Sequence, residues 1–168
     1  MTNITAETFV VTQCFNTSRE KLFKLWTDPE LLKQWFSPTG VVMTQCRMDL
    51  RSEGECHYCM QLPNGYEMWG KWLFKEIVNP EKLVTITAFS DAQGNLTRHP
   101  MSATWPLKTI ATTTFTEQGD KTLLTISCLP YEAKDEETLT FNSSLSAMQL
   151  GWAGTLAQLS TFIDSQSK

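Results

Sequence analysis

The chain has 168 residues, of which 41% are hydrophobic and 19% charged, and its formal net charge is −4. This composition is too apolar for a disordered protein, and we expect one domain over residues 1–168. The acidic balance disfavours binding to phosphate backbones, and no stretch approaches the roughly 20 apolar residues that span a bilayer, so neither nucleic acid nor membrane is an expected partner. The N-terminus lacks the basic and apolar regions of a secretory signal, which favours a cytoplasmic location.

The first part of the chain is predicted to form a strand and two short helices. Residues 8–15 alternate and are rich in β-branched and aromatic side chains, as in a strand. Thr17 followed by Glu20 three residues later is the pattern of a capping box, which predicts that a helix begins here. Asp28 is a suitable cap for a second helix over residues 29–35, because proline is favoured at the first helical position.

The middle of the chain is predicted to be a β-sheet. Between residues 41 and 128, turn signals rich in Gly, Pro, Asn and Asp delimit about six strands. The period-2 alternation of residues 56–62 favours an antiparallel, strongly curved sheet. An acidic loop is expected over Glu132–Glu137. A long C-terminal helix is then predicted from apolar residues at three- and four-residue steps, namely Leu145, Met148, Trp152, Leu156, Leu159 and Ile163.

This order of elements predicts an α+β fold. A curved antiparallel sheet of about seven strands would bend around the C-terminal helix, with the two short helices after the first strand at its side. Side chains alone do not always fill the space between such a sheet and a helix. The architecture therefore favours a pocket between the sheet and the C-terminal helix, covered by the two short helices.

Several segments resemble one known family. They are Asn16–Pro38, Met48–Gly54, Glu67–Trp72, Glu76–Val84, Thr97–Pro100, Trp105–Pro106, Lys121–Thr122 and Gly151–Trp152. They are similar to the activator of heat-shock protein 90 ATPase homologue-like family of the SRPBCC (START-like, Bet v 1-like) superfamily. The resemblance implies the helix-grip fold with its deep pocket, in a superfamily that includes lipid carriers, polyketide cyclases and antibiotic-resistance proteins. One position departs from the family pattern, because Glu53-Gly54 stands where the family usually has paired glycines.

The motif Cys56-His57-Tyr58-Cys59 looks like a metal or redox site but is not predicted to be one. Residues three apart in a strand point to opposite faces, and no second pair supplies further ligands, so we expect no metal. The five cysteines are expected to be reduced, without a disulfide framework. No glycine-rich phosphate-binding loop is found, and no cofactor is expected.

The candidate ligand-binding residues form an apolar wall with a few polar anchors. Methionine and aromatic side chains adapt to irregular ligand shapes, and an apolar pocket usually keeps a few polar groups that orient the ligand. The predicted wall consists of Tyr58, Met60, Met68, Trp72, Phe74, Phe89, Trp105, Phe115, Met148 and Trp152. The predicted anchors are Arg51, Arg98 and His99.

The function expected from these features is binding of a small hydrophobic or aromatic molecule, with no residue assigned a catalytic role. Two alternatives remain open. One is a protein-interaction module that stimulates the ATPase of a chaperone, as the resemblance implies. The other is a cofactor-free cyclase or hydrolase in which a residue such as His99 acts as acid or base. Exposed edge strands of a curved sheet often pair across a dimer, so a homodimer is also expected.

Overall fold

The computed structural model describes residues 4–166. Its elements in chain order are β1 (Phe9–Phe15), α1 (Arg19–Thr27), α2 (Pro29–Trp35), β2 (Val42–Met48), β3 (Glu55–Gln61), β4 (Glu67–Val78), β5 (Lys82–Ser90), β6 (Leu96–Thr97), β7 (Thr109–Gln118), β8 (Lys121–Pro130), α3 (Asp135–Ser143) and α4 (Leu145–Gln166). Among these residues, no helix is long and apolar enough to cross a membrane.

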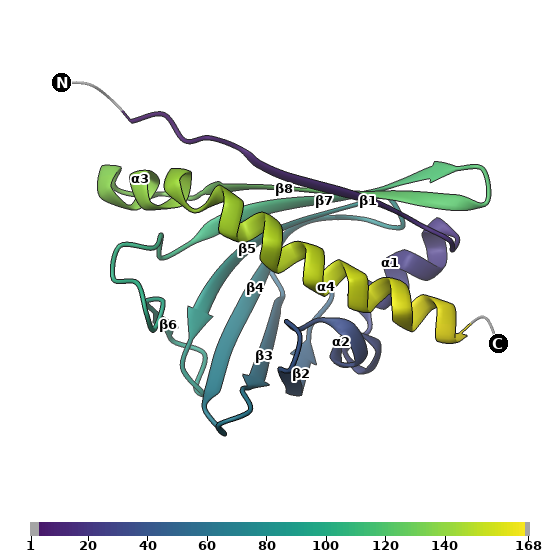
Figure 1. Ribbon diagram of the computed structural model, residues 1–168, viewed down its shortest axis with the longest axis horizontal. Helices are drawn as coiled ribbons and strands as arrows, with labels where there is room; N and C mark the ends of the chain where they lie inside the picture. The colour runs from purple at the N-terminus through teal and green to yellow at the C-terminus, as the bar shows by residue number, and fades with distance from the viewer. Residues whose placement is uncertain (1–3, 167–168) are drawn as a thin grey trace.

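The strands form one antiparallel sheet that curves around the C-terminal helix (Figure 1). Its order is β1-β8-β7-β5-β4-β3-β2, and the short β6 pairs only with β5. Helix α4 crosses the concave face, and α1 and α2 pack together at one end of the sheet (Figure 1). The predicted α+β helix-grip fold is confirmed, and the short β6 is one strand more than the seven that were expected.

The two short helices form where they were predicted, but the first is capped by a different residue. The Ser18 side chain, not that of Thr17, accepts a hydrogen bond from the Lys21 N–H at 3.3 Å. The backbone carbonyl of Thr17 instead accepts a hydrogen bond from the Thr122 hydroxyl on β8 at 2.8 Å, which ties the chain to the sheet two residues before α1 begins. Asp28 caps α2 as predicted, since its Oδ1 accepts from the Glu30 N–H at 2.9 Å.

The acidic segment expected to be a loop is in part a helix, because α3 begins at Asp135. The Glu137 carboxylate accepts a hydrogen bond from the Lys134 N–H at 2.9 Å and so satisfies a free donor at the helix N-terminus. Acidic side chains in a first helical turn also interact favourably with the helix dipole. The run that was interpreted as a loop from its charge therefore starts a helix.

The larger of two clusters of buried hydrophobic residues lies where α1 and α2 meet the sheet. Phe115 of β7 contacts the rings of Phe23 and Trp26 of α1, with centroids 5.3 and 5.9 Å apart. Phe74 of β4 is fully buried in the same cluster, together with Leu156 of α4. Helix α1 thus fills this end of the space under α4, and the other end is left without a helix to fill it.

Candidate functional site

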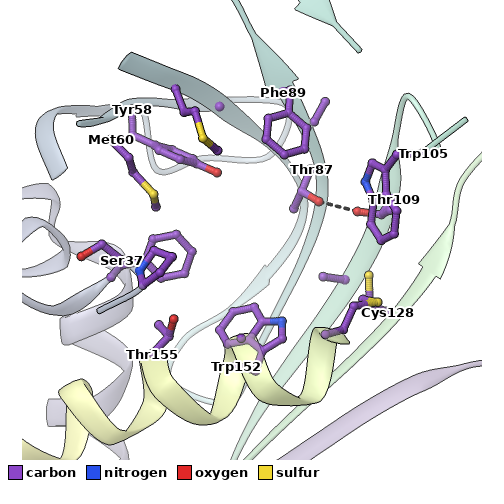
Figure 2. A pocket seen from close by; sticks show the side chains of 18 of the residues that line it. Ser37, Tyr58, Met60, Thr87, Phe89, Trp105, Thr109, Cys128, Trp152 and Thr155 are labelled. Carbon is purple, nitrogen blue, oxygen red and sulfur yellow. Dashed lines mark hydrogen bonds between the residues drawn. The ribbon is translucent and has the colours of Figure 1, made fainter. Parts of the chain in front are cut away.

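A cavity of about 390 Å³ lies between the concave face of the sheet and α4, at the end away from α1. Residues of five strands, the segment after α2, the segment before β7 and helix α4 contribute to it (Figure 2). Its lining consists of Phe36, Ser37, Pro38, Tyr58, Met60, Met68, Trp69, Gly70, Thr87, Ala88, Phe89, Trp105, Pro106, Thr109, Ala111, Ile126, Cys128, Met148, Gly151, Trp152 and Thr155.

The cavity exists because side chains on the facing surfaces become smaller along the elements. On β7, Phe115 stands in the core and Ala111, four residues earlier on the same face, lines the cavity. On α4, Leu156 is buried in the core, whereas Gly151 borders the cavity. A Cβ atom placed on Gly151 would meet nothing within 4 Å. Large residues thus fill one end, and small residues leave space at the other.

One wall of the cavity is formed by Tyr58, which is placed by a glycine on the neighbouring strand. Tyr58 of β3 pairs with Gly70 of β4, and a Cβ on Gly70 would lie 2.5 Å from the Tyr58 hydroxyl oxygen. The absence of a side chain at Gly70 therefore lets the phenol ring lie across β4. The hydroxyl group points toward the cavity (Figure 2). Burial raises the pKa of Tyr58, so this group is a neutral hydrogen-bonding group at pH 7.

A second polar point lies across the cavity on β5 and β7. The hydroxyl groups of Thr87 and Thr109 are hydrogen-bonded to each other (Figure 2). One hydroxyl donates to the other, which leaves one proton of the pair able to bond another acceptor. Cys128 of β8 also lines this side, and burial raises the pKa of its thiol to about 11, so it is uncharged at pH 7.

The segment just after α2 forms a further wall of the cavity. Phe36, just after α2, contacts the rings of Trp72 and Trp152, with centroids 5.3 and 6.0 Å apart. The carbonyl of the next residue, Ser37, accepts a hydrogen bond of 2.6 Å from Gln158 of α4. This bond holds the segment after α2, which lines the cavity, against helix α4.

Seven of the ten predicted wall residues line the cavity: Tyr58, Met60, Met68, Phe89, Trp105, Met148 and Trp152. The other three, Trp72, Phe74 and Phe115, lie on the same face of the sheet but in the core cluster beside it. Their exposed fractions are 5%, 0% and 1%. Phe23 and Trp26 of α1 cover Phe115, and Phe36 packs on Trp72, so these residues belong to the core beside the cavity and do not line it.

None of the three predicted polar anchors lines the cavity. Arg51 is exposed in the β2–β3 turn, where its Nε bonds the Asp49 carboxylate at 2.7 Å. Arg98 forms an ion pair with Glu137 of α3. His99 packs against Phe89 and Trp105, with centroids 4.7 and 6.3 Å apart. Its Nδ1 accepts a hydrogen bond from the Met101 N–H at 3.0 Å, and burial lowers its pKa. The three side chains have their partners outside the cavity lining, so none of them is placed where it could orient a ligand in the cavity.

The sequence reasoning missed the small and hydroxyl-bearing residues of the lining. Thr87, Thr109 and Ala111 lie on the concave face in phase with predicted wall residues, and Cys128 pairs with Ala111. Their signal was present in the sequence, since small side chains at in-phase strand positions indicate space that a ligand can occupy. Phe36 lies outside any strand or helix, and no periodicity points to it.

The four residues of the Cys56–Cys59 motif alternate between the two faces of the sheet. Cys56 lies in the core cluster, with its sulfur 3.7 Å from that of Cys46. Cys59 points to the other face, where its sulfur lies 3.2 Å from Glu67 Oε2. Over residues 4–166, no group of three His, Cys, Asp or Glu side chains is arranged to hold a metal ion.

Comparison with known proteins shows the family. A family model described as "Activator of Hsp90 ATPase homolog 1-like protein" matches residues 16–164, and the chain belongs to this family. The resemblance seen in the sequence is thereby confirmed. No curated protein is significantly similar to the chain in sequence.

Solved structures confirm the fold. A protein of Rhodobacter sphaeroides is 17% identical, with a TM-score of 0.76 over 96% of this chain and 95% of that one. Protein Ms6760 of Mycobacterium smegmatis is 21% identical, with a TM-score of 0.71 over 92% of this chain and 89% of the other. CalU16 of Micromonospora echinospora is 18% identical, with a TM-score of 0.60 over 96% and 79%. At these identities the likeness concerns the fold.

Proposed function

We propose that this protein binds a small, uncharged and largely apolar molecule in the cavity between the sheet and α4. The observation that carries the proposal is the cavity of about 390 Å³ with its lining of aromatic, methionine and small side chains. This volume is within the range of about 300–1,000 Å³ that is typical of small-molecule sites. Burial of an apolar ligand against such walls is favourable, at roughly 25 cal/mol per Å² of apolar surface removed from water.

The polar groups of the lining indicate which functional groups a ligand would have. The hydroxyl and thiol groups among them belong to Ser37, Tyr58, Thr87, Thr109, Cys128 and Thr155, and the lining also contains Trp69, Trp105 and Trp152, whose indole rings carry an N–H donor. Among the described residues, none with an acidic or basic side chain lines the cavity, so an uncharged ligand fits without a buried unpaired charge. After their mutual hydrogen bond the Thr87–Thr109 pair keeps one hydroxyl proton, which the neighbouring Cys128 sulfur or a ligand can accept, and the Tyr58 hydroxyl has one proton of its own. A ligand with a carbonyl, ether or hydroxyl oxygen suits these donors.

A cavity-filling variant tests the proposal. Ala111→Phe places a ring in the cavity, and Thr112→Phe places the same ring on the opposite face of the same strand as a matched control. Binding of the neutral fluorophore 1-aminoanthracene is measured by fluorescence titration. We expect the wild type and Thr112→Phe to bind the probe and Ala111→Phe to lose at least tenfold in affinity. Equal binding by all three folded proteins would show that the cavity is not the binding site.

A second candidate function is stimulation of a chaperone ATPase, which the family description supports. Such an activity depends on a docking surface and does not require an open cavity. The test is the ATPase rate of purified heat-shock protein 90 with and without this protein, using the same two variants. Stimulation that persists in Ala111→Phe would establish a co-chaperone activity separate from ligand binding, and an unchanged ATPase rate would remove this candidate.

A further inference from the structure

Two cysteines that do not line the cavity lie side by side on the β2–β3 hairpin. The sulfur atoms of Cys46 and Cys56 are 3.7 Å apart. In the register of the hairpin, Cys46 pairs with Tyr58 and Cys56 pairs with Met48, so the two cysteines are diagonal neighbours on the same face. The other three cysteines, Cys14, Cys59 and Cys128, lie elsewhere, and no sulfur contact is found between them and this pair.

The hairpin holds the pair in register. Between the two strands, the Gly54 N–H bonds the Arg51 carbonyl at 2.8 Å, and the Asp49 N–H bonds the Glu55 carbonyl at 2.9 Å. The turn is tight, since a Cβ on Gly54 would come within 2.1 Å of the Asp49 carbonyl oxygen. A disulfide has an S–S distance of about 2.05 Å, so the sulfurs need to approach by about 1.7 Å. Diagonal neighbours lie about 7–8 Å apart, at the upper limit for a disulfide, so side-chain rotation has to be accompanied by a small movement of the edge strand β2.

The two thiols differ in exposure and in chemistry. Cys46 is half-buried on the edge strand β2 and reachable from solvent, whereas Cys56 is fully buried. The hydrogen bond from the Cys56 thiol lowers the pKa of Cys46, and Lys33 of α2 acts in the same direction. The thiolate is the reactive form of cysteine, so Cys46 is the group that an oxidant meets first.

We propose that Cys46 and Cys56 are a redox modification site, in which a hydroperoxide converts the pair into a reversible disulfide across the hairpin. The Cys46 thiolate attacks one peroxide oxygen, the O–O bond breaks, and the other oxygen leaves as water or an alcohol after taking up a proton. Cys46 is then a sulfenic acid. The Cys56 sulfur attacks the Cys46 sulfur, the S–O bond breaks, and water leaves with the Cys56 proton. Two thiols are oxidised by two electrons and one peroxide is reduced.

The site is tested with hydrogen peroxide as the oxidant, in a Cys14→Ser background that removes the exposed thiol. After oxidation and blocking of free thiols, trypsin cleaves after Arg47 and Arg51, which separates Cys46 in residues 34–47 from Cys56 in residues 52–71. We expect a linked pair of these peptides by mass spectrometry, with an intact mass lower by two hydrogen atoms, and its disappearance on treatment with dithiothreitol.

Residues 52–71 also contain Cys59, and further variants identify the partner. We expect the link to persist in Cys59→Ser and to be lost in Cys46→Ser and in Cys56→Ser, with trapping of a Cys46 sulfenic acid by dimedone in Cys56→Ser. Should Cys56→Ser fail to fold, fragmentation of the linked wild-type peptides gives the same assignment. Loss of the link in Cys59→Ser, or oxidation of Cys46 to a sulfinic acid without any linked peptide in the Cys14→Ser protein, would overturn the proposal.

Discussion

Glu53, in the turn between β2 and β3, has a backbone conformation that usually belongs to glycine. Its φ angle is 67°, in the left-handed region. This is the position at which the family resemblance predicts the first of two glycines, so the turn keeps its shape with a less suitable residue. The left-handed conformation costs an L-residue roughly 1–2 kcal/mol. The Glu53 carboxylate bonds Lys75 at 2.8 Å on the surface, an interaction of the kind that contributes little to stability.

Replacing Glu53 with glycine is therefore expected to stabilise the protein. The relief of the backbone strain exceeds the greater freedom of glycine in the unfolded chain, which gives a net gain of about 0.5–1 kcal/mol in the free energy of unfolding. Urea denaturation measures the change. Glu53→Ala is the matched control, because it removes the ion pair but keeps a Cβ, and it is expected to gain nothing. A Glu53→Gly protein no more stable than Glu53→Ala would contradict this explanation of the turn.

Gly70 is the second residue with a specific steric role, since it makes room for the Tyr58 ring. Gly70→Ala is expected to destabilise the protein by about 1–3 kcal/mol, because the added methyl group forces the ring out of its position. In a Tyr58→Ala background the same substitution should leave the free energy of unfolding almost unchanged. Urea denaturation of the four proteins gives the coupling energy between the two positions. Equal costs in both backgrounds would mean that Gly70 is needed for a reason other than Tyr58.

At the scale of elements, an ion pair joins the segment before β7 to α3. Arg98 contacts the Glu137 carboxylate and also donates to the Trp105 carbonyl at 3.4 Å, next to the cavity wall. Burial favours the neutral form of Glu137. Hydrogen bonds from the Lys134 N–H and from Arg98 outweigh this effect and lower its pKa. A depressed pKa in the folded state stabilises the fold above the pKa of the unfolded chain, and this contribution is lost as the pH falls through the folded pKa.

Glu137→Gln is expected to lower the free energy of unfolding at pH 7 by about 1–3 kcal/mol, because a buried charge-assisted hydrogen bond is lost. The difference from the wild type should shrink as the pH falls through the lowered pKa of Glu137, because the wild-type carboxylate then becomes protonated as well. Glu136→Gln, the exposed neighbour, is the control and should change little. Urea titrations at pH 7 and pH 3 measure both. A Glu137→Gln deficit of the same size at both pH values would contradict the role of the charged carboxylate.

At the scale of the whole molecule, alternation and capping predicted the fold but not the limits of the cavity. The period of two in β4 places Trp72 on the same face as Met68, yet only Met68 lines the cavity. The alternation in a strand predicts on which face of the sheet a side chain lies. Whether that side chain also lines the cavity depends on which other residues pack on that part of the strand. The ring of Phe36, just after α2, packs on Trp72 at a centroid distance of 5.3 Å, and this contact joins residues that lie far apart in the chain. The hydroxyl pair Thr87–Thr109 arises likewise from the pairing of distant strands.

The cavity under α4 is the place where we propose that a small apolar molecule binds. Three methionines line it, Met60, Met68 and Met148, whereas Met48 packs against the core and Met101 is 86% exposed in a loop. The most direct measurement is a methyl NMR titration of ¹³C-methyl-methionine protein with 1-aminoanthracene. We predict saturable shifts of the three lining methyl groups, with little change at Met48 and Met101. Binding of the probe with shifts at Met101 and none at the three lining methyl groups would contradict the account.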